Sequence, residues 1–388
     1  MMYFTLFILF CLFVFSYYRS RSILHPATTT SLLWLLILTV YNFSNVVLFD
    51  LSCLFYKSLL LWCVPFCIVS LILGNVNFYC SPYLKNVYSN VKILDRIVIY
   101  VYLILFLSLI LLIQQGLSVD SENIVSGYRN YDMTNLNEKK SIYESILHYG
   151  MNISLIFVLA RMFYSDNIVG KSWKIAFLLL IVFFVIKAQK SNFILIFLFL
   201  LCFYLKKGYK RKIFYIFLFT ISLLVFVSIL RAGVHDIDFG NFIQIYTMSS
   251  LPAFDTVLLG ETVVCPNYPG EFTFNMITRL FYGNRNDLFS LERWVSVPLP
   301  TNVYTVMFNY YVDFGYLGIF IFSVLMGTFW GYLYSFFRRN ISCFVFVYSI
   351  LYYILVNQFY SDSFSLFTSR WIQYILLSIF LFLRFKKV

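Results

Sequence analysis

Apolar runs of about twenty residues, separated by polar breaks, recur along almost the whole chain. About twenty apolar residues in a helix span the hydrocarbon core of a bilayer, so each run predicts a membrane-spanning helix. The pattern predicts eleven spans, at residues 2–18, 29–49, 58–75, 97–115, 147–164, 174–187, 191–205, 213–231, 313–337, 341–359 and 366–383. The short sixth and seventh are candidates for a broken or re-entrant pair. We therefore expect an all-α, polytopic transmembrane helical bundle that forms one integral membrane domain over residues 1–388.

Two polar stretches, at residues 116–146 and 232–312, are much longer than the other breaks. Loops of this length are uncommon in compact domains unless they are functional. The second loop is rich in charged and amide side chains, and we expect it to carry short helices and the active-site region. Within it, Phe272 to Phe281 has the pattern of an amphipathic helix lying on the membrane surface.

Lysines and arginines collect on alternate breaks, and short loops rich in these residues stay on the cytoplasmic side. The clusters are Arg19 with Arg21, Lys85 with Lys92, Lys171 with Lys174, Lys206 to Lys212, Arg338 with Arg339, and Arg384 to Lys387. Both long loops fall on the opposite breaks, so we expect them outside. The C-terminus is expected in the cytoplasm and, with eleven spans, the N-terminus outside.

The composition is that of an integral membrane protein, because 61% of residues are hydrophobic and only 12% are charged. A water-soluble globule could not bury so much apolar surface. The net charge of +12 follows from the basic clusters at span ends, so no nucleic-acid partner is expected. The first apolar run lacks a small-residue cleavage site and is interpreted as a span. The eight cysteines show no C-x-x-C spacing, and no metal is expected.

Two cations lie near predicted outer span ends, against the usual charge bias. Lys190, with Lys187, falls between two apolar runs, where a retained charge usually faces a cavity or a partner. Arg231 ends the eighth predicted span, and its guanidinium suits phosphate oxygens. Both are candidate substrate-binding residues. Snorkelling of Lys190 and contact of Arg231 with lipid headgroups are the alternatives.

Two further candidate cations, Arg279 and Arg285, bracket an aromatic segment of the long loop. Each offers a fork of donors for phosphate. Ordinary ion pairing with Asp287 or Glu292 is the alternative for Arg285.

Asp313 and His235 are the candidate catalytic bases. Asp313 lies among aromatic residues at the predicted outer mouth of a span, where partial desolvation favours proton abstraction. Its alternative is a carboxylate that caps free amides at a helix N-terminus. His235 is the only histidine of the long loop, and a purely structural polar residue is its alternative.

Two runs of residues carry a resemblance to a known family. They are Leu299-Pro300-Thr301-Asn302-Val303-Tyr304-Thr305 and Tyr310-Tyr311-x-Asp313-Phe314-Gly315-x-x-Gly318. These runs resemble the signature of bacterial O-antigen polymerases, the oligosaccharide repeat unit polymerase family. The positions of Lys190 and Arg231 are also similar to those of basic residues in that family.

The resemblance implies a metal-independent glycosyltransferase without a cofactor in the bacterial inner membrane, with its active site facing the periplasm. It would join repeat units held on undecaprenyl pyrophosphate during lipopolysaccharide O-antigen biosynthesis, with membrane lipid and a chain-length regulator as partners. The outer cations would hold pyrophosphate. Sugars would contact Asn302, Tyr304, Tyr310 and Tyr311. A flippase of lipid-linked oligosaccharides and an O-antigen ligase are the alternatives, although the sequence shows no internal repeat of the kind transporters usually contain.

Overall fold

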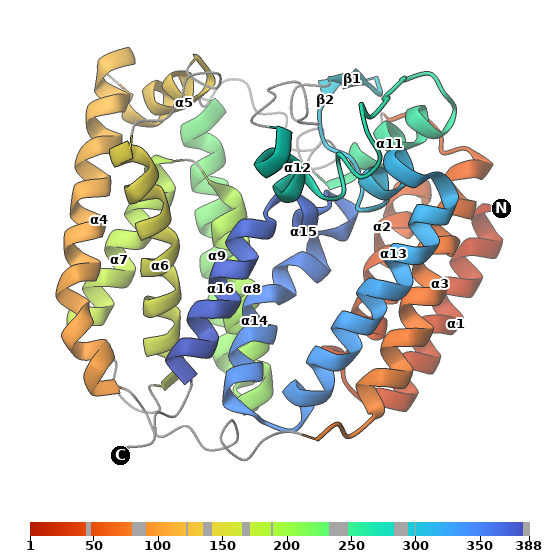
Figure 1. The fold of residues 1–388 in the computed structure, drawn as a ribbon, viewed down its shortest axis with the longest axis horizontal. Helices are drawn as coiled ribbons and strands as arrows, with labels where there is room; N and C mark the ends of the chain where they lie inside the picture. The colour runs from red at the N-terminus through yellow and green to blue at the C-terminus, as the bar shows by residue number, and fades with distance from the viewer. Residues whose placement is uncertain are drawn as a thin grey trace. The chain divides into compact units, whose positions relative to one another are not determined.

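A computed structural model of the chain describes residues 1–43, 48–79, 91–121, 123–134, 142–164, 171–187, 189–232, 247–282, 294–298 and 300–382. Helices make up 81% of the described residues. Figure 1 shows how these helices are arranged within each unit. The helices form two compact units, each assembled from segments far apart in the sequence. Unit 1 comprises Met1–Tyr79, Asp238–Asn340 and Ile354–Ser369, and unit 2 comprises Cys80–Ile237, Ile341–Tyr353 and Arg370–Val388.

Four long helices make up most of unit 1. They are α1 (Met2–Ser20), α2 (Pro26–Phe43), α3 (Cys53–Asn75) and α13 (Met307–Arg338). The shorter elements are α11 (Ser250–Leu258), α12 (Asn275–Tyr282), the 3₁₀ helix η4 (Asn357–Phe359) and α15 (Ser363–Leu366), with the antiparallel strands β1 (Val295–Ser296) and β2 (Pro300–Thr301). Within unit 1, α11, α12 and the strands gather at the end where α13 begins (Figure 1).

Unit 2 contains the helices of the middle of the chain. They are α4 (Val91–Val119), α5 (Ile124–Thr134), α6 (Ile142–Tyr164), α7 (Lys171–Ile186), α8 (Lys190–Lys207) and α9 (Lys210–Ala232), with most of α14 (Ser342–Val356) and α16 (Thr368–Phe382). The predicted outer loop 116–146 contains α5.

Six helices in the described residues are long and apolar enough to cross a membrane. They are Met2–Ser20, Cys53–Asn75, Asp95–Val119, Tyr143–Phe163, Met307–Arg338 and Ser342–Phe359. Ser172–Ile186 and Thr368–Phe382 are apolar but shorter. Each of the eleven predicted spans overlaps a helix. Among the described residues, six of these helices have the length and composition expected of a span. The structure is consistent with an all-α helical membrane protein, and the count of eleven stays a prediction.

Glycines allow α3 and α13 to pack closely in unit 1. A Cβ atom on Gly327 would lie 2.8 Å from the carbonyl oxygen of Phe66, and one on Gly331 would lie 2.8 Å from the Cβ of Leu73. The two glycines are four residues apart and therefore share one face of α13. Small residues at such spacing let helix backbones approach each other in membranes. A larger side chain at either position would push the two helices apart.

Gly315 interrupts α13 near its beginning. Its backbone angles are φ 63° and ψ −152°, a combination open almost only to glycine. The helical segment that begins at Met307 therefore ends here, and a second segment continues to Arg338. The kink separates Asp313 from the longer part of the helix.

A buried carboxylate connects α11 to the start of α3. Asp255 accepts hydrogen bonds from the backbone amide of Ser52 at 2.6 Å and from its hydroxyl at 2.5 Å. The Ser52 hydroxyl oxygen in turn accepts from the amides of Leu54 and Phe55, which caps the N-terminus of α3. The contact fixes a segment of the predicted outer loop on a long helix of the same unit.

In unit 2, one carboxylate joins three helices. Asp95 on α4 accepts from Arg161 Nε on α6 at 3.0 Å and from Trp173 Nε1 on α7 at 2.8 Å. Farther along α4, a Cβ atom on Gly127 of α5 would clash with the carbonyl oxygen of Gly116. The absence of that Cβ allows α5 to pack directly on the C-terminal end of α4.

Candidate functional site

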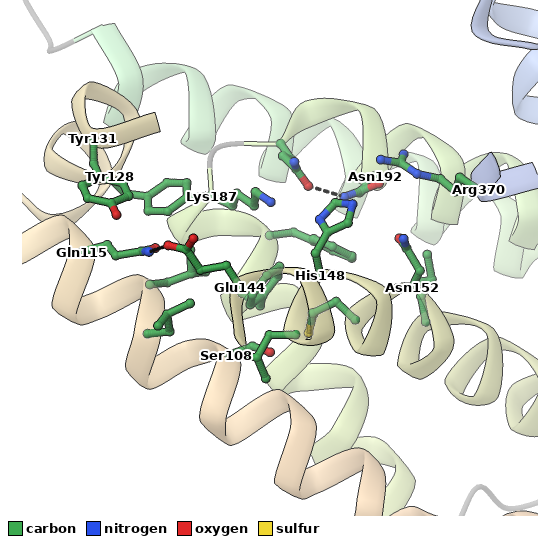
Figure 2. A pocket seen from close by; sticks show the side chains of 18 residues that line it. Ser108, Gln115, Tyr128, Tyr131, Glu144, His148, Asn152, Lys187, Asn192 and Arg370 are labelled. Atoms are coloured by element: carbon green, nitrogen blue, oxygen red, sulfur yellow. Dashed lines mark hydrogen bonds between the residues drawn. The ribbon is translucent and has the colours of Figure 1, made fainter. Parts of the chain in front are cut away.

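A polar cavity of about 100 Å³ lies within unit 2. Side chains from α4, α5, α6, α16 and the connection between α7 and α8 line it, as Figure 2 shows. Its polar lining includes Gln115, Glu144, His148, Asn152, Lys187 and Arg370. Such convergence of polar groups from several helices is typical of ligand sites between the helices of a bundle.

Helix α6 supplies Glu144, His148 and Asn152. The three residues are spaced four apart, so they occupy one face of the helix. In Figure 2, His148 projects between the side chains of Lys187 and Asn152. The helix therefore brings a carboxylate, an imidazole and an amide to a single wall of the cavity.

The short connection between α7 and α8 supplies the opposite wall. Lys187 directly follows α7, where its backbone amide still donates to the carbonyl of Phe183 at 3.0 Å. The side-chain amide of Asn192 donates to Gln189 Oε1 at 2.6 Å, which braces the start of α8. A cation just after a helix C-terminus is favoured by the partial negative charge of the helix end. Lys187 is thus held at the cavity by the end of α7.

Hydrogen bonds connect two of the polar lining residues to neighbouring helices. Gln115 Nε2 on α4 donates to Glu144 Oε1 at 2.6 Å. The hydroxyl of Tyr374 on α16 donates to Asn152 Oδ1 at 3.3 Å. These contacts orient the polar face of α6 and connect it with the helix that carries Arg370.

The charged groups of the lining favour an anion. Lys187 and Arg370 contribute two positive charges, against one carboxylate from Glu144, with His148 counted as neutral. An arginine guanidinium binds phosphate oxygens through two parallel hydrogen bonds, and a lysine acts as a point charge. The arrangement suits a phosphate or pyrophosphate group.

The size of the cavity limits what it can hold. One water molecule needs about 10–15 Å³ on a comparable measure, so 100 Å³ accommodates a small polar group. A drug-sized ligand needs about 300–1,000 Å³. The cavity is therefore sized for a headgroup and is too small for a whole oligosaccharide.

The predicted substrate-binding cations fall in both units. Lys190 is the first residue of α8 and is half-buried, three residues beyond Lys187. Arg231 and Arg279 lie in α9 and α12, but their side chains lie outside the described part of the chain. Arg285, and the predicted base His235, lie outside the described residues altogether.

The four predicted sugar-binding residues lie in unit 1, and two of the tyrosines belong to its core. The ring of Tyr310 is stacked with Trp62 at 5.6 Å and with Phe322 at 4.5 Å, and the residue is fully buried. Tyr304 stacks on Phe308 at 4.2 Å and is also buried. In this structure neither ring has a free face for a sugar.

The other two members of this predicted group, Tyr311 and Asn302, are half-buried. The ring of Tyr311 lies edge-on to Tyr316 at 5.2 Å and to Phe254 at 5.9 Å. Their predicted contacts with sugars stay predictions.

Asp313 holds the outer segment of unit 1 against α13. Its carboxylate accepts from the backbone amide of Thr273 at 2.6 Å and from that of Phe272 at 3.1 Å. Gly270, with φ 86°, turns the chain immediately before these amides. The alternative to catalysis was that Asp313 caps free amides at a helix N-terminus. In the structure Asp313 does accept from free amides, but they belong to the segment before α12.

Sequence reasoning did not select Glu144, His148, Asn152 or Arg370. The spacing of the first three is a signal that could have found them, because it predicts a polar face on an otherwise apolar helix. The same spacing also occurs on solvent-facing helices, so only the convergence with Lys187 identifies the cavity. Among the residues that the structure describes, no group of three or more histidine, cysteine, aspartate or glutamate side chains is placed to hold a metal ion.

No protein-family model, curated protein or solved structure matches this chain.

Proposed function

We propose that this protein is an O-antigen polymerase that joins undecaprenyl-pyrophosphate-linked oligosaccharide repeat units at the outer face of the bacterial inner membrane. The observation that carries the proposal is the placement of Lys187 and Arg370 on one cavity of unit 2. The resemblance of residues 299–318 to the polymerase signature supports the same reaction.

The direction of α7 and α8 supports an outward-facing cavity. Both helices have their basic ends away from it, with Lys171 and Lys174 at the start of α7 and Lys206 and Lys207 at the end of α8. The 18 residues of α8 extend about 27 Å, close to the roughly 30 Å of a bilayer core. Basic span ends favour the cytoplasm, which supports an outer position for the cavity.

In the proposed reaction, the bond between the anomeric carbon of the donor glycan and a pyrophosphate oxygen breaks. The acceptor hydroxyl oxygen forms the new bond to the same carbon. The leaving pyrophosphate keeps the bonding electrons and gains negative charge. Lys187 and Arg370 stabilise that charge, which is the kind of electrostatic effect that contributes most to many enzymatic rates.

The acceptor hydroxyl also loses its proton, and His148 is the group of the cavity proposed to receive it. An imidazole titrates close to neutral pH and is the commonest general base in enzymes. Glu144 already accepts a hydrogen bond from Gln115, which suits it to positioning the wall of the cavity. Asp313 and His235 stay alternative proposals for the base.

The reacting sugar hydroxyl and the pyrophosphate would enter the small cavity, and the two lipid tails and the rest of the glycans would lie outside it. Lys190, Arg231, Arg279 and Arg285 stay proposed substrate-binding residues, each within its own unit.

Deletion of the gene, followed by electrophoresis of lipopolysaccharide, tests the function. A polymerase deletion leaves single repeat units attached to the lipid core and removes the ladder of longer chains. Loss of the single-unit band as well would indicate a flippase, and long chains that accumulate on the lipid carrier would indicate a ligase. Complementation with His148→Gln should fail to restore the ladder. A ladder restored by this variant would reject His148 as the base.

A further inference from the structure

Helix α12 has its polar and apolar faces reversed relative to a helix that faces water. Leu280 and Phe281 are 74% and 78% exposed, and Ile277 is 50% exposed. Asn275 and Thr278 are buried. The exposed residues are spaced three and four apart, so they form one continuous apolar face.

Within the described residues, the buried polar face of α12 is hydrogen-bonded at Thr278, whereas Asn275 Oδ1 is buried without a hydrogen-bond partner. The hydroxyl of Thr278 donates to the carbonyl of Asn275 at 3.0 Å and lies 3.5 Å from that of Glu271. Because Asn275 and Thr278 face the protein, the side chains of Ile277, Leu280 and Phe281 are left exposed within the described part of the chain. In water, an exposed apolar face of this kind would be unfavourable.

The apolar face continues onto the outer surface of α13. Phe274, directly before α12, has ring contacts with Phe314 at 6.5 Å and Phe322 at 6.0 Å. Beyond the kink, Leu317 of α13 is 66% exposed, and this helix is long and apolar enough to span a membrane. The exposed surface of a spanning helix faces lipid, so the same lipid extends to the beginning of α12.

Asp313 sets the height of α12 relative to the span. Its carboxylate accepts hydrogen bonds from the amides of Phe272 and Thr273, three and two residues before α12 begins. Asp313 itself lies at the N-terminal end of α13, before the kink at Gly315. Helix α12 therefore starts close to the N-terminal end of the long apolar helix α13.

We propose that α12 is an interfacial helix that docks on the outer leaflet, with Ile277, Leu280 and Phe281 inserted at the boundary between headgroups and acyl chains. The partner is the lipid surface. Amphipathic helices bind in this way by burying an apolar face a few ångströms into the bilayer. The proposal does not depend on the reaction proposed above, and it gives the 232–312 loop a second attachment to the membrane.

Depth-dependent fluorescence quenching tests this docking in the full chain. Leu280→Cys and Phe281→Cys are labelled separately with bimane in a background whose exposed Cys11, Cys53 and Cys265 are serine. Each protein is placed in phosphatidylcholine and phosphatidylglycerol nanodiscs. Quenching by a lipid with a nitroxide near its headgroup is compared with quenching by iodide in the water.

Glu261→Cys provides the matched control, because Glu261 is an exposed charged residue of the same loop. The unmodified background gives the residual signal. Labels at Leu280 and Phe281 should be quenched severalfold more by the nitroxide lipid than by iodide, and the label at Glu261 should show the opposite order. Equal behaviour of all three sites in iodide would overturn the proposal. So would insensitivity of Leu280 and Phe281 to both quenchers, since protein would then cover them.

Discussion

Asp313 on α13 accepts a hydrogen bond from the backbone amide of Thr273 at 2.6 Å, across forty residues of sequence. With the amide of Phe272 held by the same carboxylate, the contact fixes the segment before α12 on the first part of α13. The contact thereby joins a segment of the long loop to the run Tyr310 to Gly318.

Asp313→Ala should destabilise this structure, because two partly buried amides lose their acceptor. We expect the free energy of unfolding to fall by about 1–3 kcal/mol. Asp313→Asn keeps one acceptor oxygen and should lose less. Thermal unfolding in detergent measures both variants. An Asp313→Asn protein that unfolds normally but makes no polymer would instead support the role of Asp313 as the base.

Neutralising either cation of the cavity should impair polymerisation. Lys187→Gln and Arg370→Gln each remove a charge proposed to stabilise the leaving pyrophosphate, and a loss on the order of 100-fold in rate is expected. The length distribution of lipopolysaccharide in complemented cells measures the effect. Lys174→Gln is the matched control, because it removes an exposed lysine at the opposite end of α7. Equal loss in all three variants would argue against a specific anion site.

The contact between Asp255 and Ser52 should make stability depend on pH. The pKa of Asp255 is raised because burial disfavours the charged carboxylate and because Glu261 is near, while hydrogen bonds from Ser52 act in the opposite direction. The fold therefore binds this proton more tightly than the unfolded chain. The resulting stability is fully present below the unfolded pKa of about 3.9 and is lost as pH rises through the higher folded value.

Asp255→Asn cannot ionise and should lack this dependence. Unfolding temperatures of the two proteins, compared from about pH 3.5 to about pH 7, isolate the contribution of one carboxyl group. Wild type should lose stability relative to Asp255→Asn as pH rises. Parallel curves would show that the environment of Asp255 does not differ between folded and unfolded chains.

The glycine face of α13 should not tolerate a methyl group. A Cβ on Gly327 would lie 2.8 Å from the Phe66 carbonyl oxygen, so Gly327→Ala should cost about 1–3 kcal/mol through overpacking. Leu325→Ala changes a side chain that is 53% exposed, and should stay within about 0.5 kcal/mol. Thermal unfolding in the same detergent compares them. Similar unfolding temperatures for both would contradict the close helix contact.

The proposed orientation predicts opposite readings from topology reporters. Alkaline phosphatase fused after Asn267 should be active, because this part of the long loop is expected in the periplasm. A fusion after Lys210 should be inactive, because that residue begins α9 at the basic end. Reversed activities would place the cavity in the cytoplasm and remove the access of lipid-linked repeat units to it.

The positions of the long helices follow directly from the sequence, since an apolar run of sufficient length forms a helix in lipid whatever its neighbours are. Their ends follow less well. Helix α3 begins at Cys53, five residues before the predicted span, because Ser52 caps it. Helix α13 begins at Met307, six residues before the predicted span, because a short helical segment precedes the kink at Gly315.

The cavity could be predicted only in part. Lys187 was recognisable as a charge between two apolar runs, and the four-residue spacing of Glu144 and His148 is visible in the sequence. Arg370 is separated from them by about two hundred residues, so nothing local indicates that it joins them. Conversely, Tyr310 lies in a motif-like run, yet packing between Trp62 and Phe322 buries it.

The glycine contact between α3 and α13 also bears on biogenesis. Residues 75 and 307 bound the interval between the two helices, and a ribosome that adds about 5–20 residues per second needs roughly 10–50 s to make it. Throughout that interval α3 has entered the membrane while its closest partner has yet to be synthesised. Either lipid or the insertion machinery must occupy the groove meanwhile and then leave when α13 arrives. Assembly of unit 1 is consequently a late, post-insertion event.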